Sequence, residues 1–204
     1  MADKRDRLAL LCRMWSKCAS CELSTYRSKV VEWRGNPEAK LMMVGEAPGG
    51  DEDEQGIPFV GQAGRTLDEL MDEADLSQDR VFICNMIACR PPGNRVPLSA
   101  ELAACRPRLD AMIWITQPEV IVTLGSVSAS RIVGVRPITS WRGNVVDMER
   151  MLIHNKQVHN CVAVPTFHPS YLNRQGNNLD MRRQIVGDLK KAAGIAYGKA
   201  SDKT

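Results

Sequence analysis

The sequence contains no apolar run of about 18 residues and no strong excess of charge of either sign, and it has only three histidines. Without such an apolar run, no transmembrane helix is predicted. A net charge of +3 does not by itself indicate a protein that binds nucleic acid. Internal repeats and low-complexity segments are also missing. With 204 residues, 44% of them hydrophobic and 25% charged, we expect a single globular domain over residues 1–204.

The N-terminal segment begins with basic residues, but its apolar part is short and is interrupted by Arg13. We therefore predict that it is not a signal peptide and that the protein is cytoplasmic. Charge is unevenly distributed along the chain. Acidic residues concentrate at 46–54 and 68–75, and basic residues at 90–108 and 174–191. The two basic segments are compatible with a local basic face.

Short apolar runs alternate with helical patterns along most of the chain. We predict strands at 41–44, 81–87, 120–124 and 162–166, and helices at 4–15, 64–76, 99–116, 126–133 and 179–196. Within the helix at 99–116, Ser99 is the predicted N-cap and Pro107 a predicted kink or break. The pattern predicts irregular structure at 24–40 and a hairpin within 138–161. Strands that alternate with helices predict an α/β fold, namely a three-layer αβα sandwich around a central four-stranded parallel sheet.

Seven cysteines are many for a reducing compartment, where patterned cysteines indicate metal or redox chemistry rather than disulfides. Cys18 and Cys21 form a CxxC pair, and Cys89 and Cys105 follow later in the chain. Four thiolates at one site suit either tetrahedral zinc or an iron–sulfur cluster, and ligand type alone does not separate the two. A redox pair and unrelated buried thiols are the alternatives. The other cysteines lie in apolar patterns and are predicted to be core residues: Cys12, Cys84 and Cys161.

Polar residues stand at or directly after the ends of the four predicted strands. The carboxyl ends of parallel strands meet at one edge of a sheet, where open α/β sheets keep their chemistry. An Asn amide offers a donor and an acceptor to a pyrimidine edge. A His can donate to an oxygen that gains negative charge, and a carboxylate can position water or stabilise a cationic sugar. Each residue alone is explained equally well by a structural role, but their shared location favours a base-reading glycosylase: Glu46, Asn85, Ser126 and His168.

Several separated motifs, in this order, resemble the family 4 uracil-DNA glycosylases over about residues 12–190. The motifs are Gly45-Glu46-Ala47-Pro48-Gly49, Glu52-Asp53, Gly56-Ile57-Pro58-Phe59-Val60-Gly61 with Ala63-Gly64, Asn85, Cys89-Arg90-Pro91-Pro92-Gly93-Asn94-Arg95, Cys105 and His168-Pro169-Ser170.

The resemblance implies a uracil-DNA glycosylase-like fold with a cluster-binding N-terminal segment, about residues 1–40, packed on it. It implies a [4Fe–4S] cluster held by Cys18, Cys21, Cys89 and Cys105. The implied activity is DNA repair: uracil is flipped out of single- or double-stranded DNA and its N-glycosidic bond is hydrolysed, which leaves an abasic site. DNA that contains uracil is thus the expected partner, and we expect a monomer that is not attached to a membrane.

The resemblance also implies roles for individual residues in the pocket. Phe59 is expected to stack on the extruded uracil, and Asn85 to read the O4 and N3 edge that separates uracil from cytosine. His168 is expected to support the negative charge that develops at O2. Glu46 is expected to assist the attack of water. The segment Gly45–Ala47 is expected to line the pocket.

Other roles implied by the resemblance concern selectivity and DNA contact. Glu52 is expected to obstruct the methyl group of thymine. Tyr171 and Leu172 are expected to form a wedge that fills the hole left in the duplex, and Arg174 to contact a phosphate. One branch of the superfamily traps uracil covalently through a His in a loop between the third and fourth cluster cysteines. Residues 90–104 contain no His, so covalent trapping is disfavoured.

Two functions of other classes stay open at this level. One is a non-catalytic module that binds DNA containing uracil or a modified pyrimidine, and the other is an iron–sulfur redox protein. The joined set of Glu46, Phe59, Asn85 and His168 favours the enzyme over both.

Overall fold

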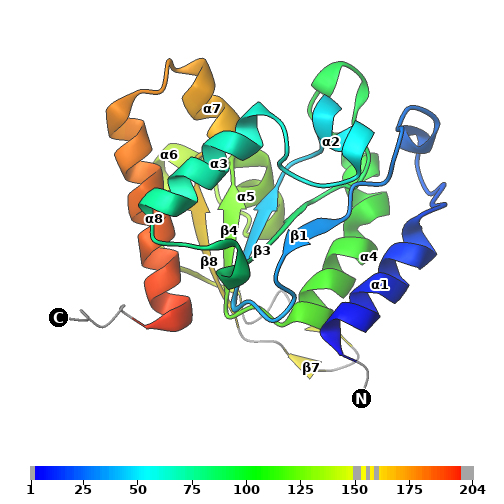
Figure 1. Ribbon diagram of the computed structural model, residues 1–204, viewed down its shortest axis with the longest axis horizontal. Coiled ribbons are helices and arrows are strands. Elements are labelled where there is room, and N and C mark those ends of the chain that lie inside the picture. Colours follow the sequence, from blue (N-terminus) through cyan, green and yellow to red (C-terminus); the bar gives the residue numbers. More distant parts are fainter. Residues whose placement is uncertain (1–2, 149–152, 155–156, 159–160, 199–204) are drawn as a thin grey trace.

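The computed structural model describes residues 3–148, 153–154, 157–158 and 161–198. A mixed sheet lies at the centre, with helices on both faces (Figure 1). Its six strands follow the order β1-β3-β2-β4-β8-β5. The bounds of these strands are β1 Trp33–Gly35, β2 Leu41–Gly45, β3 Val81–Asn85, β4 Val120–Leu124, β5 Val146–Asp147 and β8 Val162–Thr166.

The predicted four-stranded parallel sheet is confirmed as the centre of this larger sheet. Strands β3, β2, β4 and β8 pair in parallel, and β1 and β5 add one antiparallel strand at each edge. The prediction of irregular structure at 24–40 is wrong for β1. A short strand in a polar segment carries no clear alternation of apolar and polar residues. Strand β1 is held by its pairing with β3 and by Trp33, whose ring stacks on that of Phe82 with 5.3 Å between the ring centroids.

Eight α-helices occur in the described residues, together with 3₁₀ turns at Glu22–Thr25, Gln78–Arg80 and Pro92–Asn94. Their bounds are α1 Lys4–Trp15, α2 Gly50–Gln55, α3 Gln62–Glu73, α4 Ser99–Thr116, α5 Ser126–Ile132, α6 Ile138–Trp141, α7 Pro169–Arg174 and α8 Leu179–Tyr197. The five predicted helices are confirmed within a few residues. The short helices α2, α6 and α7 were missed because four to six residues carry too little periodicity.

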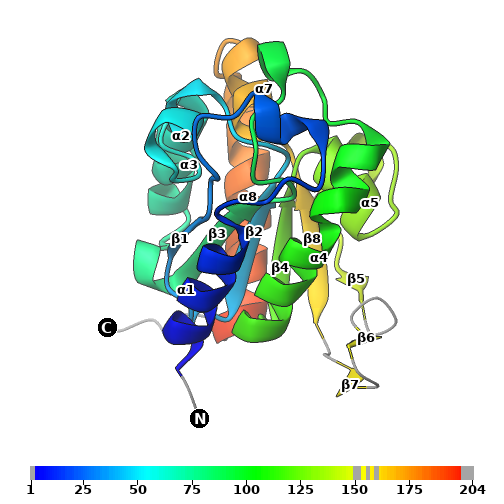
Figure 2. The ribbon, with the colours of Figure 1, turned by 90° about the vertical axis from the view of Figure 1, so that its right-hand side faces the viewer.

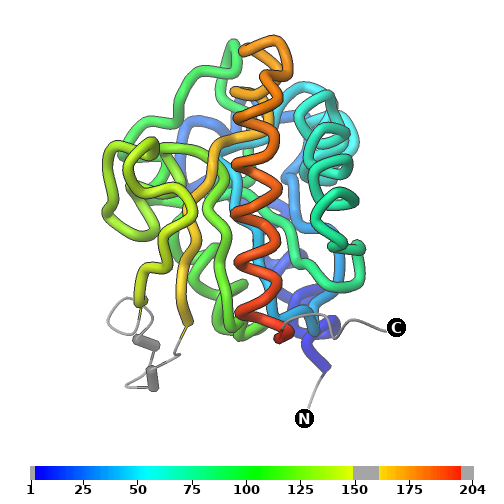
Figure 3. Tube along the Cα trace, turned by 90° about the vertical axis from the view of Figure 1, so that its left-hand side faces the viewer, coloured from blue at the N-terminus to red at the C-terminus, as the bar shows by residue number. Residues whose placement is uncertain are grey.

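Alternate residues of the central strands face opposite layers, as a strand requires. Leu41 and Met43 of β2 belong to the core beneath α3, α7 and α8, whereas Met42 and Val44 belong to the core beneath α1, α4 and α5. Figure 2 shows α1 and α4 on one side of the sheet, and Figure 3 shows α8 crossing the opposite side. The same alternation holds in β3. Asn85, at the end of this strand, is therefore expected to face the layer of α3, α7 and α8.

Helix α4 differs from the prediction at two positions. Its N-cap is Leu98 rather than Ser99, because the Glu101 carboxylate accepts a hydrogen bond from the Leu98 N–H at 2.7 Å. Pro107 lies inside the helix without ending it. A proline removes one backbone hydrogen bond, and here the burial of Leu109 and Met112 one turn later keeps the helix continuous.

Two further predictions concern strand ends and the segment at 138–161. The second predicted strand ends at Asn85 rather than at residue 87. The hairpin is confirmed by antiparallel pairing of β6 (Ile153–His154) with β7 (Gln157–Val158), while residues 149–152, 155–156 and 159–160 lie outside the described part of the chain. None of the helices in the described ranges is long and apolar enough to cross a membrane.

Candidate active site

The carboxyl edge of the sheet holds a cavity of about 800 Å³. Strand order reverses beside β2, which has β3 on one side and β4 on the other, and ligands bind at such switch points in open α/β sheets. The short helices α2 and α7 lie at this end of the molecule, and both ends of the described chain lie at the other (Figure 1). All four polar residues predicted at the strand ends line the cavity: Glu46, Asn85, Ser126 and His168.

Asn85 is the most buried polar side chain of the cavity wall, with 3% of its surface exposed. It pairs in register with Gly45 of β2, and both positions face the α3, α7 and α8 layer by parity. The Oδ1 atom of Asn85 is buried and has no hydrogen-bond partner in the described structure. A buried amide oxygen without a partner is costly, and it is therefore available to a donor on a ligand.

Gly45 leaves the space between Asn85 and Phe59. A Cβ atom at Gly45 would lie 2.4 Å from Asn85 Oδ1 and 2.5 Å from Phe59 Cζ. In the predicted lining segment Gly45–Ala47, Glu46 and Ala47 line the cavity directly. Gly45 lies against two side chains that line it.

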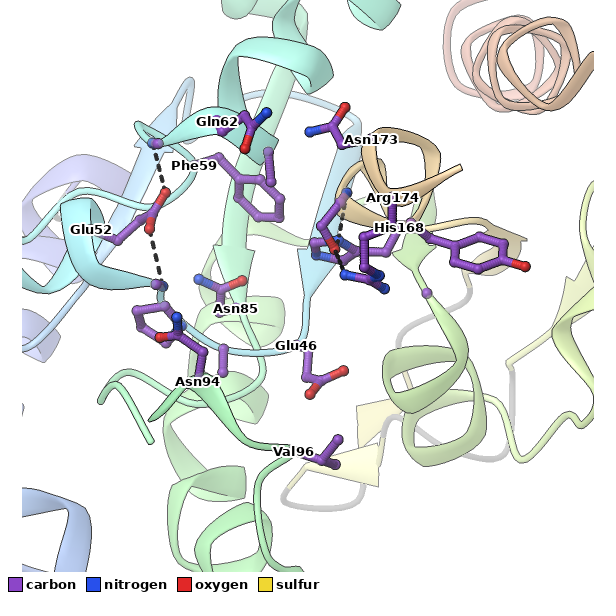
Figure 4. A pocket seen from close by; sticks show the side chains of 18 of the residues that line it. Glu46, Glu52, Phe59, Gln62, Asn85, Asn94, Val96, His168, Asn173 and Arg174 are labelled. Atoms are coloured by element: carbon purple, nitrogen blue, oxygen red, sulfur yellow. Dashed lines mark hydrogen bonds between the residues drawn. The ribbon is translucent and has the colours of Figure 1, made fainter. Parts of the chain in front are cut away.

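Phe59 occupies the loop between α2 and α3 and presents its ring to the cavity (Figure 4). Its backbone has a φ of 56°, in the left-handed region that non-glycine residues rarely adopt. Helix α3 packs closely on this loop, because a Cβ atom at Gly64 would lie 1.9 Å from the Phe59 carbonyl oxygen. The Phe59 and His168 rings lie 5.9 Å apart between centroids, so two aromatic groups from distant segments share one wall.

Glu52 holds the loop that carries Phe59 through hydrogen bonds to its backbone. One carboxylate oxygen accepts hydrogen bonds from the Val60 N–H at 3.0 Å and the Gly61 N–H at 2.8 Å, and the other accepts from the Gly49 N–H at 3.0 Å. Two of these contacts are drawn in Figure 4. Glu52 lines the cavity as expected, but its carboxylate is engaged by the backbone. Sequence reasoning missed this positioning role.

His168 is held in one tautomer by the residues that follow it. The Ser170 N–H donates to His168 Nδ1 at 3.1 Å, so Nδ1 is an acceptor and the proton of the neutral ring is on Nε2. Ser170 Oγ lies 2.8 Å from the same Nδ1 and accepts from Arg174 at 3.1 Å. Burial, and then the nearby Arg174 cation, lower the pKa of His168 to about 4. The ring is therefore neutral at neutral pH.

The approach of His168 to the sheet edge depends on Gly125, which directly follows β4 and has a φ of 98°. A Cβ atom there would lie 3.0 Å from His168 Cβ, and the left-handed backbone is one that glycine adopts without strain. Gly125 also donates its N–H to the Thr166 carbonyl oxygen at 2.9 Å, which joins the ends of β4 and β8.

Glu46 projects from the end of β2 toward the open side of the cavity (Figure 4). Burial raises the pKa of this carboxyl, and the cation of Arg174 partly opposes the shift. The cavity thus contains a carboxylate, a neutral imidazole and an uncommitted amide oxygen, which is the set of groups that the sequence predicted at this edge.

The two residues of the predicted wedge, Tyr171 and Leu172, differ in burial. Tyr171 is 38% exposed, whereas Leu172 is fully buried in the core beneath α7 and α8. The expectation that Leu172 enters the duplex is therefore not supported, because adjacent residues of a helix point in different directions and Leu172 is the inward one. Tyr171 and Arg174 line the cavity, and the Arg174 guanidinium lies 5.9 Å from the centre of the Tyr171 ring.

Several cavity residues were not singled out from the sequence. Gln62 begins α3 directly after Gly61, and Asn173 lies on α7 beside Arg174. The Asn173 side-chain oxygen accepts from Thr66 Oγ1 at 2.9 Å, which ties α7 to α3 across the cavity. Their only signal was proximity to motifs already identified. Other residues of this kind include Asp51, Val96, Ile138, Thr139 and Phe167.

A second, smaller cavity lies on the α1 and α4 side and gathers the four predicted ligands Cys18, Cys21, Cys89 and Cys105. Arg27 closes it by donating to Cys89 Sγ at 3.2 Å and to the Cys18 carbonyl oxygen at 2.7 Å. Burial raises the pKa of Cys21, and negative charge on Cys105 and Cys18 raises it further. The shared cavity is what places the four thiols at one site.

The donor chemistry of these thiols limits which groups they could hold. Within the described residues, no group of three or more His, Cys, Asp or Glu side chains is arranged to hold a single metal ion. A tetrahedral zinc ion brings thiolates to about 4 Å from one another, since each Zn–S bond is about 2.3 Å. An iron–sulfur cluster keeps them farther apart because each cysteine binds a different iron. Four cysteines around one cavity supply a donor set that suits either a zinc ion or an iron–sulfur cluster.

The three cysteines predicted to be core residues are buried: Cys12, Cys84 and Cys161. Burial raises their pKa values to about 12, so these thiols are protonated and inert.

Residues 32–190 match the model of the uracil DNA glycosylase superfamily. Similar curated proteins include the type-4 uracil-DNA glycosylase of Thermotoga maritima, 40% identical over 94% of this chain and 96% of the relative. Those of Sulfurisphaera tokodaii and Saccharolobus solfataricus are each 37% identical, over 88% and 81% of this chain and 80% and 76% of the relatives. The family match covers all six strands of the central sheet and the whole cavity edge, and the chain therefore belongs to the uracil DNA glycosylase superfamily and, within it, to the type-4 uracil-DNA glycosylases.

Proposed function

We propose that the large cavity binds a uracil flipped out of DNA and hydrolyses its N-glycosidic bond, leaving an abasic site. The observation that carries this proposal is the buried Asn85 Oδ1, an acceptor without a partner in the wall of the large cavity. Membership of the type-4 uracil-DNA glycosylases agrees with this reading.

Base recognition follows from the chemistry of the Asn85 amide. Its Oδ1 accepts from the N3–H of uracil, while its amide nitrogen donates to O4. Cytosine has an acceptor at N3 and a donor at N4, so both contacts would be mismatched and the amide oxygen would stay unpaired. Phe59 supplies the stacking face. The Glu52 side chain, held rigid by three backbone N–H groups, restricts the space near the uracil C5 position.

His168 acts on the leaving group. Breaking the bond between N1 and C1′ places the electron pair on uracil, and negative charge develops at O2. Because His168 accepts at Nδ1, its Nε2–H is the group that donates to O2. The low pKa keeps the ring neutral, so the donor is in place before the reaction and needs no proton uptake.

Glu46 acts on the sugar side of the bond. Its carboxylate, when ionised, positions the water that adds to C1′ and stabilises the oxocarbenium-like sugar. The water oxygen forms the new bond to C1′, and its proton leaves to Glu46 or solvent. Glu46, Asn85 and His168 are thus the proposed catalytic residues, with Gly45, Ala47, Glu52 and Phe59 completing the substrate site.

DNA contact is proposed for Tyr171 and Arg174, which lie at the cavity rim. Tyr171 is exposed enough to enter the space left by the flipped base, and Arg174 is placed to meet a phosphate. Leu172 supports α7 from within the core rather than entering the duplex. We further propose a monomeric, cytoplasmic enzyme over a single domain.

A [4Fe–4S] cluster is proposed for the smaller cavity, held by Cys18, Cys21, Cys89 and Cys105. When bound, such a cluster supplies four iron–thiolate bonds that join the N-terminal segment to α4 and to the loop after β3. No step of the base-excision chemistry is assigned to it.

The test is excision from single- and double-stranded oligonucleotides that contain one uracil, followed by alkali to cleave abasic sites. Asn85→Ala should lower the single-turnover rate about 10²-fold, because two hydrogen bonds to the base are lost. His168→Ala should lower it about 10²–10³-fold through loss of the oxyanion donor. Asn144→Ala is the matched control, since Asn144 is exposed and outside the cavity. Binding of uracil-containing DNA without any abasic product would instead support a non-catalytic module.

A further inference from the structure

Arg108 of α4 is a fully buried guanidinium, with 2% of its surface exposed. Throughout the described ranges it forms no ion pair with a carboxylate, and its Nε–H has no hydrogen-bond partner. A buried charge normally requires a charged partner, because its desolvation costs several kcal/mol. The partner of Arg108 is therefore not a carboxylate.

Arg108 touches the base-reading strand directly. Its Nη2 donates to the Asn85 carbonyl oxygen at 2.7 Å, and its Nη1 contacts Met112 Sδ at 3.3 Å. This hydrogen bond fixes the backbone of Asn85 at the end of β3. The side chain of the same residue carries the amide oxygen without a partner and lines the large cavity. Any shift of this carbonyl moves the Asn85 side chain with it.

Arg108 also lines the smaller cavity, together with the four cysteines. It lies one turn after Cys105 on α4. Four thiolates bring negative charge into a cavity whose described lining residues include no carboxylate and two cations, Arg27, which donates to Cys89 Sγ, and Arg108. The orphan Nε–H is thus available to an anionic group in that cavity.

We propose that Arg108 is a positioning residue that links the two sites: its charge balances the thiolates of the cysteine cavity, and its guanidinium fork holds Asn85 in the uracil-reading geometry. This inference rests on the proposed function and cofactor. It explains why an arginine, whose planar fork serves two partners at once, occupies a core position where an apolar residue would otherwise pack.

The test compares the purified holoprotein with Arg108→Met and Arg108→Lys. In Arg108→Met, the visible absorbance of the cluster should decay at least about tenfold faster in the presence of a chelator. Arg108→Lys keeps the charge, and its decay should stay close to that of the wild type. In both variants uracil excision should fall by at least about tenfold, because a single ammonium does not reproduce the fork.

The matched control is Arg34→Met, which removes another largely buried guanidinium with an orphan Nε. Arg34 pairs with Asp68 and lines neither cavity, so it should lose stability but keep both cluster lifetime and excision near wild type. Wild-type cluster decay in Arg108→Met would overturn the charge role. Full excision by Arg108→Lys would overturn the positioning role. A wild type without excision refutes the proposed function instead, and the decay comparison still stands.

Discussion

Gly45→Ala places a methyl group between the two walls of the base pocket. The new Cβ would lie 2.4 Å from Asn85 Oδ1, and 2.5 Å and 2.8 Å from Phe59 Cζ and Cε2. Ordinary contacts are 3.4–4 Å, so one or both side chains must move by about 1 Å. A misplacement of about 1 Å at a reacting group costs on the order of 10² in rate. We therefore expect kcat/KM for uracil excision to fall about 10²-fold.

The change should spare the fold, because the groups that meet the methyl are side chains rather than backbone. Single-turnover excision and thermal unfolding, measured on the same preparation, separate the two effects. Gly187→Ala is the control: a Cβ at Gly187 meets no atom within 4 Å, and replacing glycine within helix α8 should stabilise the protein by about 1 kcal/mol. Wild-type excision by Gly45→Ala would refute the assignment of Asn85 to the edge and Phe59 to the face of one bound base.

Two further predictions concern proton transfer and the cysteines. Arg174→Met should shift the acidic limb of the pH–rate profile to higher pH, because the Arg174 cation lowers the pKa of Glu46 and excision needs that carboxyl ionised. An unchanged limb, measured from pH 4 to 8, would exclude Glu46 as the titrating group. Cys89→Ser should abolish most of the visible absorbance of the purified protein, whereas Cys84→Ser should retain it and lose about 1–3 kcal/mol of stability to a buried hydroxyl. Equal loss of colour in both would contradict the assignment of the cluster ligands.

The central sheet was predictable because its four strands are apolar on both faces. Runs such as Val120–Leu124 are fully buried, and such runs have few alternatives in a chain of this kind. The edge strands were not predictable, since β1 and β5 have three and two residues and owe their conformation to pairing partners far along the chain. The continuity of α4 through Pro107 is likewise decided by packing and not by local propensity.

The part of the candidate site formed by residues at the strand ends was predictable, because parallel topology brings these ends together. The supporting contacts were not. The three backbone donors around Glu52 join residues that are adjacent only after α2 has formed, and α2 was missed. The tautomer of His168 depends on a backbone N–H two residues later, and the burial of Leu172 on the direction of a six-residue helix. None of these leaves a periodic signal in the sequence.

The in-register pairing of Gly45 with Asn85 determines which changes of chain length the enzyme tolerates. Deleting one residue within β2 or β3 would preserve an apolar strand and the sandwich around it, yet every side chain beyond the deletion would turn to the opposite face. After a deletion in β3 the base-reading amide would enter the layer of the cysteines, and the cavity would lose its acceptor; after a deletion in β2 the Gly45 and Glu46 positions would be displaced instead. Length changes in the segments that connect the helices leave this parity untouched. We therefore expect single-residue deletions in these strands to abolish activity, whereas length changes in the connecting segments preserve it.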